Sequence, residues 1–162
     1  MQSKGYRLSY ETNLKIALEG RARLNVGYDV YLSSGVALRA ENDAVISIGD
    51  RFFVNKNSSI LARYGITIGD DCMIGEQVTI IDHNHVFENT SIPFNQQGYT
   101  GKTIVIGNNV WIGSGVFIGP GVHIGSNVVI GAGTVVTKSI PSGVKVYNRR
   151  ELVMIPLFGD ER

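Results

Sequence analysis

The sequence predicts an all-β protein in which short parallel strands wind into a coil, and three observations support this prediction. Aliphatic residues recur every six residues, glycine is abundant (20 glycines against four prolines in 162 residues), and one polar segment interrupts the period. A period of six does not fit an amphipathic helix, whose apolar residues recur every three or four residues. It fits a triangular coil, in which a short strand and a sharp corner alternate three times per turn.

The repeat begins near residue 18 and continues as far as residue 66. Asn42 is the one polar residue at a six-residue position there, and a two-residue insertion then moves the register to Ile68, Ile74 and Ile80. We expect the aliphatic side chains to point inward and to stack on their equivalents about 4.8 Å away in neighbouring coils. The inward residues of this part are Leu18, Leu24, Val30, Val36, Ile48, Val54, Ile60 and Ile66.

The most regular stretch is IGNNVWIGSGVFIGPGVHIGSNVVIGAG, which starts at Ile106. Isoleucine stands at positions 106, 112, 118, 124 and 130, each time followed by glycine, and Val136 extends the series. Corners require small residues and residues that tolerate a positive φ, so the Gly, Asn and Asp that follow many of the aliphatic residues are expected to form the corners. These positions build a scaffold and perform no chemistry.

The repeat lapses between Ile80 and Ile106, and we expect one protruding loop over about residues 82–105. An excursion of this length from a regular coil indicates either function or disorder. The aromatic residues Phe87, Phe94 and Tyr99 favour an ordered loop that packs on another surface. Because functional residues are common on loops held by a rigid scaffold, this loop is the first place to look for a site.

The hexads resemble those of the hexapeptide-repeat family, whose fold is a left-handed parallel β-helix. The resemblance covers about residues 18–141, and it is the sole basis for the handedness, which departs from the usual right-handed crossover. It implies a single domain over residues 1–162, with β-helix coils at 18–141, the loop at 82–105 and a C-terminal tail at 142–162.

A zinc site is the first possibility, because a hydrated zinc needs three protein ligands and the chain has three histidines, His83, His85 and His123. The hexapeptide-repeat carbonic anhydrases take two of their ligands from a pair five residues apart. Here His123 stands alone and the other two lie at the start of the loop, so we expect no metal.

General base catalysis is the second possibility, because an imidazole can accept the proton of a sugar hydroxyl at neutral pH. In this region the chain is similar to the acetyl-CoA-dependent sugar O-acetyltransferases, including the galactoside, maltose and streptogramin enzymes. The resemblance implies that His85 is the catalytic base, that Asn84 and Asn55 contact the acceptor, and that His83 braces the loop. Strand parity does not separate the two histidines, and Asn55 has a plain alternative as a corner residue with positive φ.

The same resemblance implies the residues that bind acetyl-CoA. Trp111 would line the pantetheine groove from an outward position, and Ser114 would lie near the thioester carbonyl, where it can stabilise the oxyanion. Subunit packing for Trp111 and a corner role for Ser114 are the plain alternatives. Further along the cofactor, the resemblance implies a backbone contact at Ala132, phosphate contacts at Thr137 and Lys138, and a replacement of the missing adenine-end contacts by Arg149 or Arg150.

The implied function is direct transfer of an acetyl group from acetyl-CoA to a sugar or glycan hydroxyl, for example in a bacterial surface polysaccharide or its precursor. The implied assembly is a homotrimer with active sites between subunits. An N-acyltransferase acting on an amino-sugar nucleotide and a non-catalytic β-helix scaffold are the alternatives. The sequence identifies neither the sugar nor its hydroxyl, and it leaves Asp82, Glu88 or a backbone carbonyl as the orienting partner of His85.

Composition excludes several other classes. The net charge of +1 predicts no nucleic-acid partner, and no apolar run is long enough to predict a membrane span. The N-terminal segment lacks the apolar core of a signal peptide, and the single cysteine, Cys72, excludes an intrachain disulfide. A cytoplasmic protein with a small buried cysteine is therefore expected.

Overall fold

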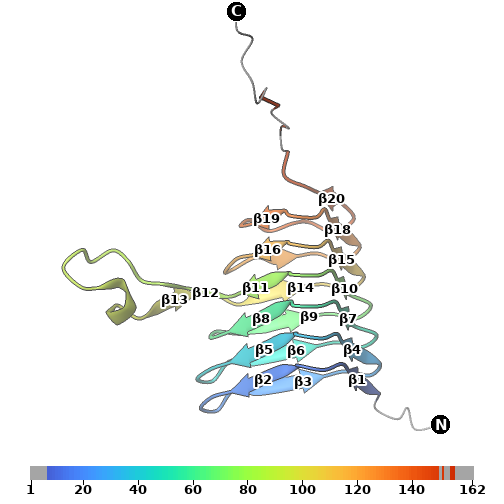
Figure 1. Ribbon diagram of the computed structural model, residues 1–162, viewed down its shortest axis with the longest axis horizontal. Helices are drawn as coiled ribbons and strands as arrows, with labels where there is room; N and C mark the ends of the chain where they lie inside the picture. Colours follow the sequence, from blue (N-terminus) through green and yellow to red (C-terminus); the bar gives the residue numbers. More distant parts are fainter. Residues whose placement is uncertain (1–6, 150, 152–153, 156–162) are drawn as a thin grey trace, which may run out of the picture.

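The structure is a computed structural model that describes residues 7–149, 151 and 154–155. It is a parallel β-solenoid in which three sheets run along the stack of coils (Figure 1). Sheet A contains β1 (Leu8–Tyr10), β4 (Val30–Leu32), β7 (Phe53–Val54), β10 (Met73–Ile74), β15 (Val110–Ile112), β18 (Val128–Ile130) and β20 (Lys145–Val146). Sheet B contains β2 (Lys15–Leu18), β5 (Ala37–Ala40), β8 (Ser59–Ala62), β11 (Thr79–Ile81), β16 (Phe117–Ile118) and β19 (Val135–Val136). Sheet C contains β3 (Arg23–Val26), β6 (Val45–Ile48), β9 (Ile66–Ile68), β14 (Ile104–Ile106) and β17 (His123–Ile124).

Each coil visits the sheets in the order A, B, C, so three kinds of corner repeat along the stack: the A–B, B–C and C–A corners. No helix in the described part of the chain has the length and apolar character that would let it cross a bilayer. The one helical element among the described residues is a short 3-10 turn, η1 (Phe94–Gln96).

The coils shorten along the stack, which corrects the expected register. Lys15 pairs with Ala37, 22 residues later, whereas Val105 pairs with His123 after 18 residues. The strict hexad therefore applies only after the loop. The first and last residues of β9, Ile66 and Ile68, are both buried, so the supposed shift at 66–68 is a single strand with two inward isoleucines. Asn42 lies in a corner with φ of 61° and occupies no core position.

The expected core is otherwise confirmed. The aliphatic residues of the series from Val30 to Val136 that lie in the strands are buried and stack in register between coils. Leu18 is 45% exposed and Leu24 is half-buried, because both lie in the first coil of the described chain and only the coil above covers them.

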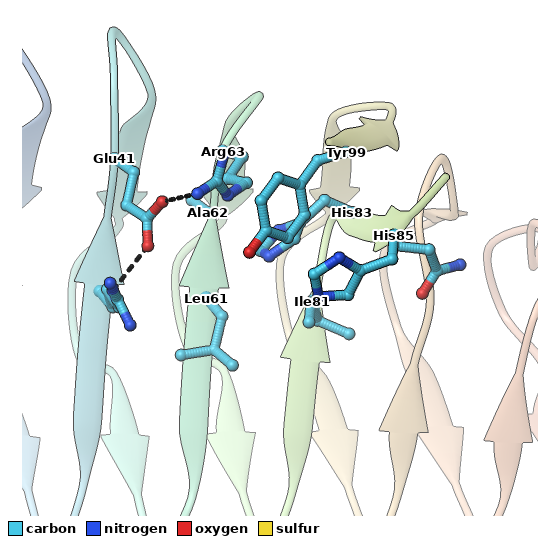
Figure 2. Close-up of a pocket in the computed structure, with 10 residues that line it drawn as sticks. Glu41, Leu61, Ala62, Arg63, Ile81, His83, His85 and Tyr99 are labelled. Carbon is cyan, nitrogen blue, oxygen red and sulfur yellow. Dashed lines mark ion pairs between the residues drawn. The ribbon is translucent and has the colours of Figure 1, made fainter. Parts of the chain in front are cut away.

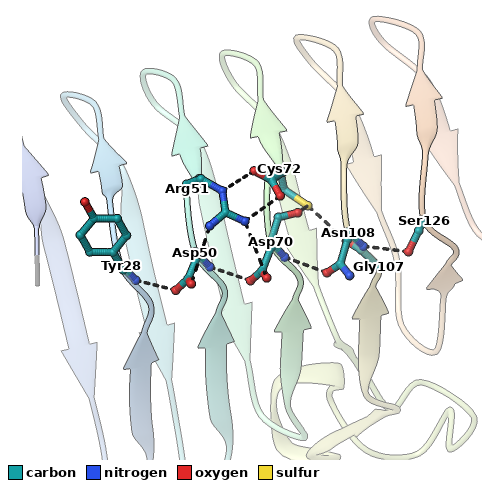
Figure 3. A network of polar contacts seen from close by, with 9 residues as sticks. Tyr28, Asp50, Arg51, Asp70, Cys72, Gly107, Asn108 and Ser126 are labelled. Atoms are coloured by element: carbon teal, nitrogen blue, oxygen red, sulfur yellow. Dashed lines mark hydrogen bonds and ion pairs between the residues drawn. The ribbon is translucent and has the colours of Figure 1, made fainter. Parts of the chain in front are cut away.

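A ladder of polar side chains joins the C–A corners (Figure 3). Asp50 Oδ1 accepts the N–H of Tyr28 at 2.8 Å, and Asp70 Oδ1 accepts the N–H of Asp50 at 2.8 Å. Asn108 and Ser126 continue the same contact into the next coils. Each side chain thus satisfies a backbone donor in the coil beneath it.

This ladder explains why glycine follows the aliphatic residue, and the reason differs from the one expected. Gly49 and Gly69 do not have positive φ values; a Cβ on Gly69 would collide with the Asn108 side-chain oxygen. The positive φ falls two residues later, for example at Asp71 (58°) and Asn109 (52°). Glycine is therefore required at these positions by close approach of the next coil rather than by backbone conformation.

The loop leaves the coil after β11, at the B–C corner, and projects from the stack (Figure 1). It begins as an antiparallel ribbon of β12 (His83–His85) and β13 (Tyr99–Gly101), and the coil resumes at Ile104. The expectation that its aromatic residues pack on another surface is wrong for Phe87 and Phe94 within one chain, because these residues are 63% and 62% exposed. Gln97 instead orders the outer loop by bonding to the backbone of Asn89 and Ile92.

Candidate active site

The candidate site is built around Asp82, the residue that follows β11 at the B–C corner. Its side chain is fully buried, and its carboxylate accepts backbone N–H groups of Arg63, Tyr64 and Gly65 in the coil beneath, at 2.9, 2.8 and 2.6 Å. The same oxygen that binds Arg63 lies 2.8 Å from His83 Nδ1. A buried carboxylate needs such donors to offset the loss of water, and Asp82 has four.

Asp82 therefore orients His83, not His85, which answers the question left open by the sequence. Since the carboxylate is the acceptor, the proton of this pair is assigned to His83 Nδ1, and Nε2 is left for other contacts. The His83 side chain is 14% exposed and lines the adjacent pocket. The other suggested partner, Glu88, accepts the N–H of Phe87 at 3.2 Å.

His85 is oriented by an aromatic ring. It pairs in register with Tyr99, and the two ring centroids lie 4.3 Å apart. Tyr99 also meets the edge of His83, and the Arg63 guanidinium lies 3.5 Å above the Tyr99 ring centroid. The exposed imidazole of His85 is thus held in the stack Arg63–Tyr99–His85, without a side-chain hydrogen bond to any described residue.

Gly101 allows the ribbon to lie against the coil at this point. It pairs with His83, and a Cβ on Gly101 would collide with the Asp82 carbonyl oxygen and approach His83 Cα to 2.8 Å. The two strands therefore reach the Asp82 corner only because one of them carries glycine there.

A pocket of about 310 Å³, which we call the histidine pocket, opens beside these side chains (Figure 2). Leu61 and Ile81, outward residues of neighbouring sheet B strands, form its apolar side. The complete lining is Arg39, Glu41, Leu61, Ala62, Arg63, Ile81, His83, Asn84, His85 and Tyr99.

An ion-pair cluster completes the lining of the histidine pocket, and one of its members, Arg39, pairs in register with Leu61. Glu41, whose side chain is 12% exposed, lies between two guanidinium groups: Arg39 Nε is 2.7 Å from one carboxylate oxygen, and Arg63 contacts the other. Sequence reasoning missed this cluster. Glu41 and Arg63 occupy the same corner of successive 22-residue coils, a spacing that a six-residue period does not reveal.

The residues expected to bind acetyl-CoA lie in two other places. Trp111, Ser114 and Ala132 line a groove of about 340 Å³ at the A–B corner, together with Gly75 and Lys145; we call it the tryptophan groove. Trp111 is 54% exposed, which confirms its outward position. The Ser114 hydroxyl accepts the N–H of Glu76 at 3.3 Å, so its corner role is also present.

Thr137 and Lys138 line a separate pocket of about 360 Å³ near the last coils. Asn148 also lines this pocket, and its side-chain oxygen accepts the N–H of Val135 at 2.6 Å. Arg149 follows Asn148 as an exposed residue, and Arg150 lies outside the described residues.

Asn55 lies at the A–B corner, apart from the histidines in the same chain. It precedes β8, whereas Arg63 and the histidine pocket follow it, so the strand separates them. The positive φ at this corner belongs to Asn57 (57°), which means that the corner explanation does not account for Asn55. Its Oδ1 accepts the N–H of Lys56 at 2.8 Å.

The remaining reactive side chains are separate from these sites. Cys72 is buried, burial raises the pKa of its thiol, and its sulfur lies 3.2 Å from the Gly107 carbonyl oxygen, as expected of a packing residue. His123 lies on sheet C. Among residues 7–149, 151 and 154–155, no group of three His, Cys, Asp or Glu side chains is placed to hold a metal ion.

Comparison with known proteins agrees with this architecture. Residues 103–138 match the family described as bacterial transferase hexapeptide (six repeats), and residues 45–80 match the hexapeptide repeat of succinyl-transferase. A search of curated proteins gives no significant match.

Three solved structures illustrate the similarity. A maltose O-acetyltransferase from Clostridium difficile 630 is 36% identical over 83% of this chain and 62% of its own, with a TM-score of 0.55. A galactoside acetyltransferase in complex with coenzyme A is 34% identical over 83% of this chain and 61% of its own, also with a TM-score of 0.55. A variant of the N-acyltransferase AntD from Bacillus cereus, in complex with dTDP and coenzyme A, has a TM-score of 0.72 over 89% of this chain and 80% of its own; at 18% identity it shares the fold alone. The chain thus spans about three fifths of the two acetyltransferases.

Proposed function

We propose that this chain, which belongs to the hexapeptide-repeat transferase family, transfers an acetyl group from acetyl-CoA to a hydroxyl of a sugar or glycan. One observation carries the proposal: at the loop, the coil presents two oriented histidines beside a pocket of about 310 Å³ that has apolar and charged lining residues. The similarity to two sugar O-acetyltransferases, one of them bound to coenzyme A, supports the acceptor class and the donor. A bacterial surface polysaccharide or its precursor would be a fitting acceptor.

The reaction is a direct transfer within a complex of both substrates. His85 accepts the proton of the acceptor hydroxyl as its oxygen attacks the thioester carbonyl. The negative charge that develops on the carbonyl oxygen is stabilised by a donor near Ser114. The tetrahedral intermediate then collapses, the C–S bond breaks, and the thiolate of CoA takes the proton held by His85.

The tryptophan groove suits the pantetheine arm of the donor. Gly75, Gly113, Gly131 and Ala132 line it with small side chains or none, and Trp111 supplies an apolar wall. The pocket at Thr137 and Lys138 would hold the phosphates. Arg149 and Arg150 are the proposed contacts of the 3′-phosphate, which suits guanidinium geometry; double replacement by Ala should weaken CoA binding in calorimetry, and unchanged affinity would remove them from the site.

The separation of the two regions supports a site shared between chains, and the proposed assembly is a homotrimer. Within one chain, the tryptophan groove and the histidine pocket lie at opposite ends of the sheet B strands. The outward row of sheet A is apolar and in register from coil to coil, and such a patch favours a protein partner. Its members are Tyr31, Phe53, Met73, Trp111 and Val129. Light scattering should show a trimer at micromolar concentration, and a monomer would contradict the shared site.

The test of the proposed function measures release of free CoA from acetyl-CoA with a panel of hexoses and with amino-sugar nucleotides. A reaction without any acceptor is the control. Hexose-dependent release is the expected result. Release only with an amino-sugar nucleotide would move the activity to N-acylation. No release with any acceptor would favour a non-catalytic scaffold.

A further inference from the structure

We propose that the histidine pocket binds one pyranose ring of the acceptor and that the Arg39–Glu41–Arg63 cluster selects which hydroxyl reaches the histidines. This inference rests on the proposed function and identifies the acceptor site that it requires. It assigns acceptor recognition to residues that lie in the two coils beneath the loop.

The lining of the histidine pocket offers both kinds of contact that a pyranose makes, apolar and hydrogen-bonding. The side chains of Leu61 and Ile81 lie next to each other on the outer face of sheet B and offer an apolar surface for the C–H face of a ring. The ion-pair cluster faces the same space with charged donors and acceptors for the hydroxyl groups (Figure 2). A volume of about 310 Å³ is at the small end for ligand pockets, which suits one ring rather than several.

Glu41 is held ready to accept a hydroxyl. Each of its carboxylate oxygens already contacts one guanidinium, and each can accept a further hydrogen bond. Because both neighbours are charged and the side chain is nearly buried, the carboxylate keeps its orientation before a ligand binds. A charge-assisted bond to a preset carboxylate is stronger and more directional than a bond between neutral groups.

Arg39 supplies the complementary donor. Its Nε contacts Glu41, and its Nη2 contacts Glu19. Its Nη1 has no partner among the described residues. Arg39 is half-exposed and lines the pocket, so this nitrogen can donate to a ring hydroxyl or to an acidic group on the sugar.

The cluster is also connected to the catalytic histidine. Arg63 contacts Glu41 on one side and lies over Tyr99 on the other, and Tyr99 packs against His85. The distance between the anchoring groups and the imidazole is therefore fixed by packed side chains. A ring held by Glu41 and Arg39 can bring only certain hydroxyls to His85, which gives the pocket its regioselectivity.

The experiment compares the wild-type protein with Arg39→Met, a change that keeps the aliphatic stem and removes the donors. The acceptor KM should rise about tenfold or more, as expected for the loss of one hydrogen bond to a charged group. The KM for acetyl-CoA should not change, and NMR of the product should show acetyl groups on additional hydroxyls. Arg21→Met is the matched control, because Arg21 also binds a carboxylate, that of Asp43, but lies outside the pocket; it should leave both KM values unchanged.

Several outcomes would overturn the inference. An unchanged acceptor KM and product pattern in Arg39→Met, or a change confined to the KM for acetyl-CoA, would remove the cluster from acceptor recognition while the proposed function stands. If the Met variant unfolds, Arg39→Lys tests the same point, because it keeps the charge and loses the fork; it too must raise the acceptor KM. If the wild-type protein acetylates no sugar, saturation-transfer NMR with hexoses decides separately: binding that Arg39→Met weakens supports the pocket, and no binding refutes it.

Discussion

The C–A corners and the B–C corner at the loop use the same structural device for different ends. At the C–A corners, a polar side chain accepts a backbone N–H from the coil beneath, and this contact repeats from Asp50 to Ser126. At the B–C corner, Asp82 accepts three such N–H groups and also binds His83. The candidate site thus needed no new architecture: a corner carboxylate that stabilises the coil gained one contact that positions a histidine.

The two kinds of corner also differ in how much a substitution should cost. The C–A ladder residues Asp50 and Asp70 are partly exposed. Each accepts one backbone N–H, a contact that a water molecule could make in its place. Asp82 is fully buried and serves four donors at once. Substitutions should therefore have larger effects at the loop corner, both on activity and on stability.

The largest expected effect is on activity. Replacing His85 with Ala should reduce turnover at least about 100-fold, because the variant lacks the proposed base for the hydroxyl proton. The urea unfolding midpoint should not change, since His85 is exposed. His83→Ala is the control, and it should reduce turnover less. A fully active His85→Ala variant together with an inactive His83→Ala variant would assign the base to the Asp82–His83 pair.

The largest expected effect on stability is at Asp82. Asp82→Ala leaves three backbone N–H groups of a tight corner and the His83 ring without their acceptor, so we expect a loss of about 3 kcal/mol or more in the free energy of unfolding. Urea denaturation followed by circular dichroism measures this. A loss below about 1 kcal/mol would show that water replaces the carboxylate and that the corner does not depend on it.

Removing one side chain of the C–A ladder should reduce the free energy of unfolding less than removing Asp82. Asp70→Ala removes one acceptor, that of the Asp50 N–H, and water can reach the vacated position. We expect a loss of about 1 kcal/mol in unfolding free energy and no change in turnover. If Asp70→Ala destabilised the protein as much as Asp82→Ala, the contrast between the two corners would be wrong.

The smallest expected effect comes from an exposed ion pair on the C–A corner. Arg51 holds the pKa of Asp71 below its ordinary range through a direct side-chain hydrogen bond. Because the folded-state pKa is the lower one, the stabilisation is present above the unfolded-state pKa of about 3.9 and is lost as the pH falls through the folded-state pKa. The urea midpoints of the wild-type protein and Asp71→Asn should differ slightly at pH 7 and coincide near pH 2. A difference that persisted at low pH would mean that Asp71 acts through its shape rather than its charge.

Much of the fold could be predicted because the inward residues are aliphatic and regularly spaced. The buried series, the position of the loop and the outward Trp111 all follow from that spacing. Coil length could not be predicted, because lengthening a corner by one or two residues leaves the composition unchanged. The register error at residues 66–68 and the missed Arg39–Glu41–Arg63 cluster both arise because the coil length was not predicted.

The pairing of Asp82 with His83 had a detectable signal. Asp82 stands two residues after the buried Ile80, so strand parity alone directs its side chain inward, where an acidic residue needs donors. Which histidine Asp82 binds depends on the ribbon that starts at His83. That ribbon forms because Gly101 packs closely against Asp82 and His83. This contact joins residues distant in the sequence, so the sequence pattern did not reveal it.

The proposed active site joins the histidine pocket of one chain to the tryptophan groove of another. Mixing two inactive variants tests it most directly: His85→Ala, and Ala132→Trp, which blocks the groove that Ala132 lines. After unfolding and refolding together in equal amounts, random trimers should contain intact interfaces, and about a quarter of wild-type CoA release should return. A mixture that stays as inactive as its components would contradict a site shared between chains.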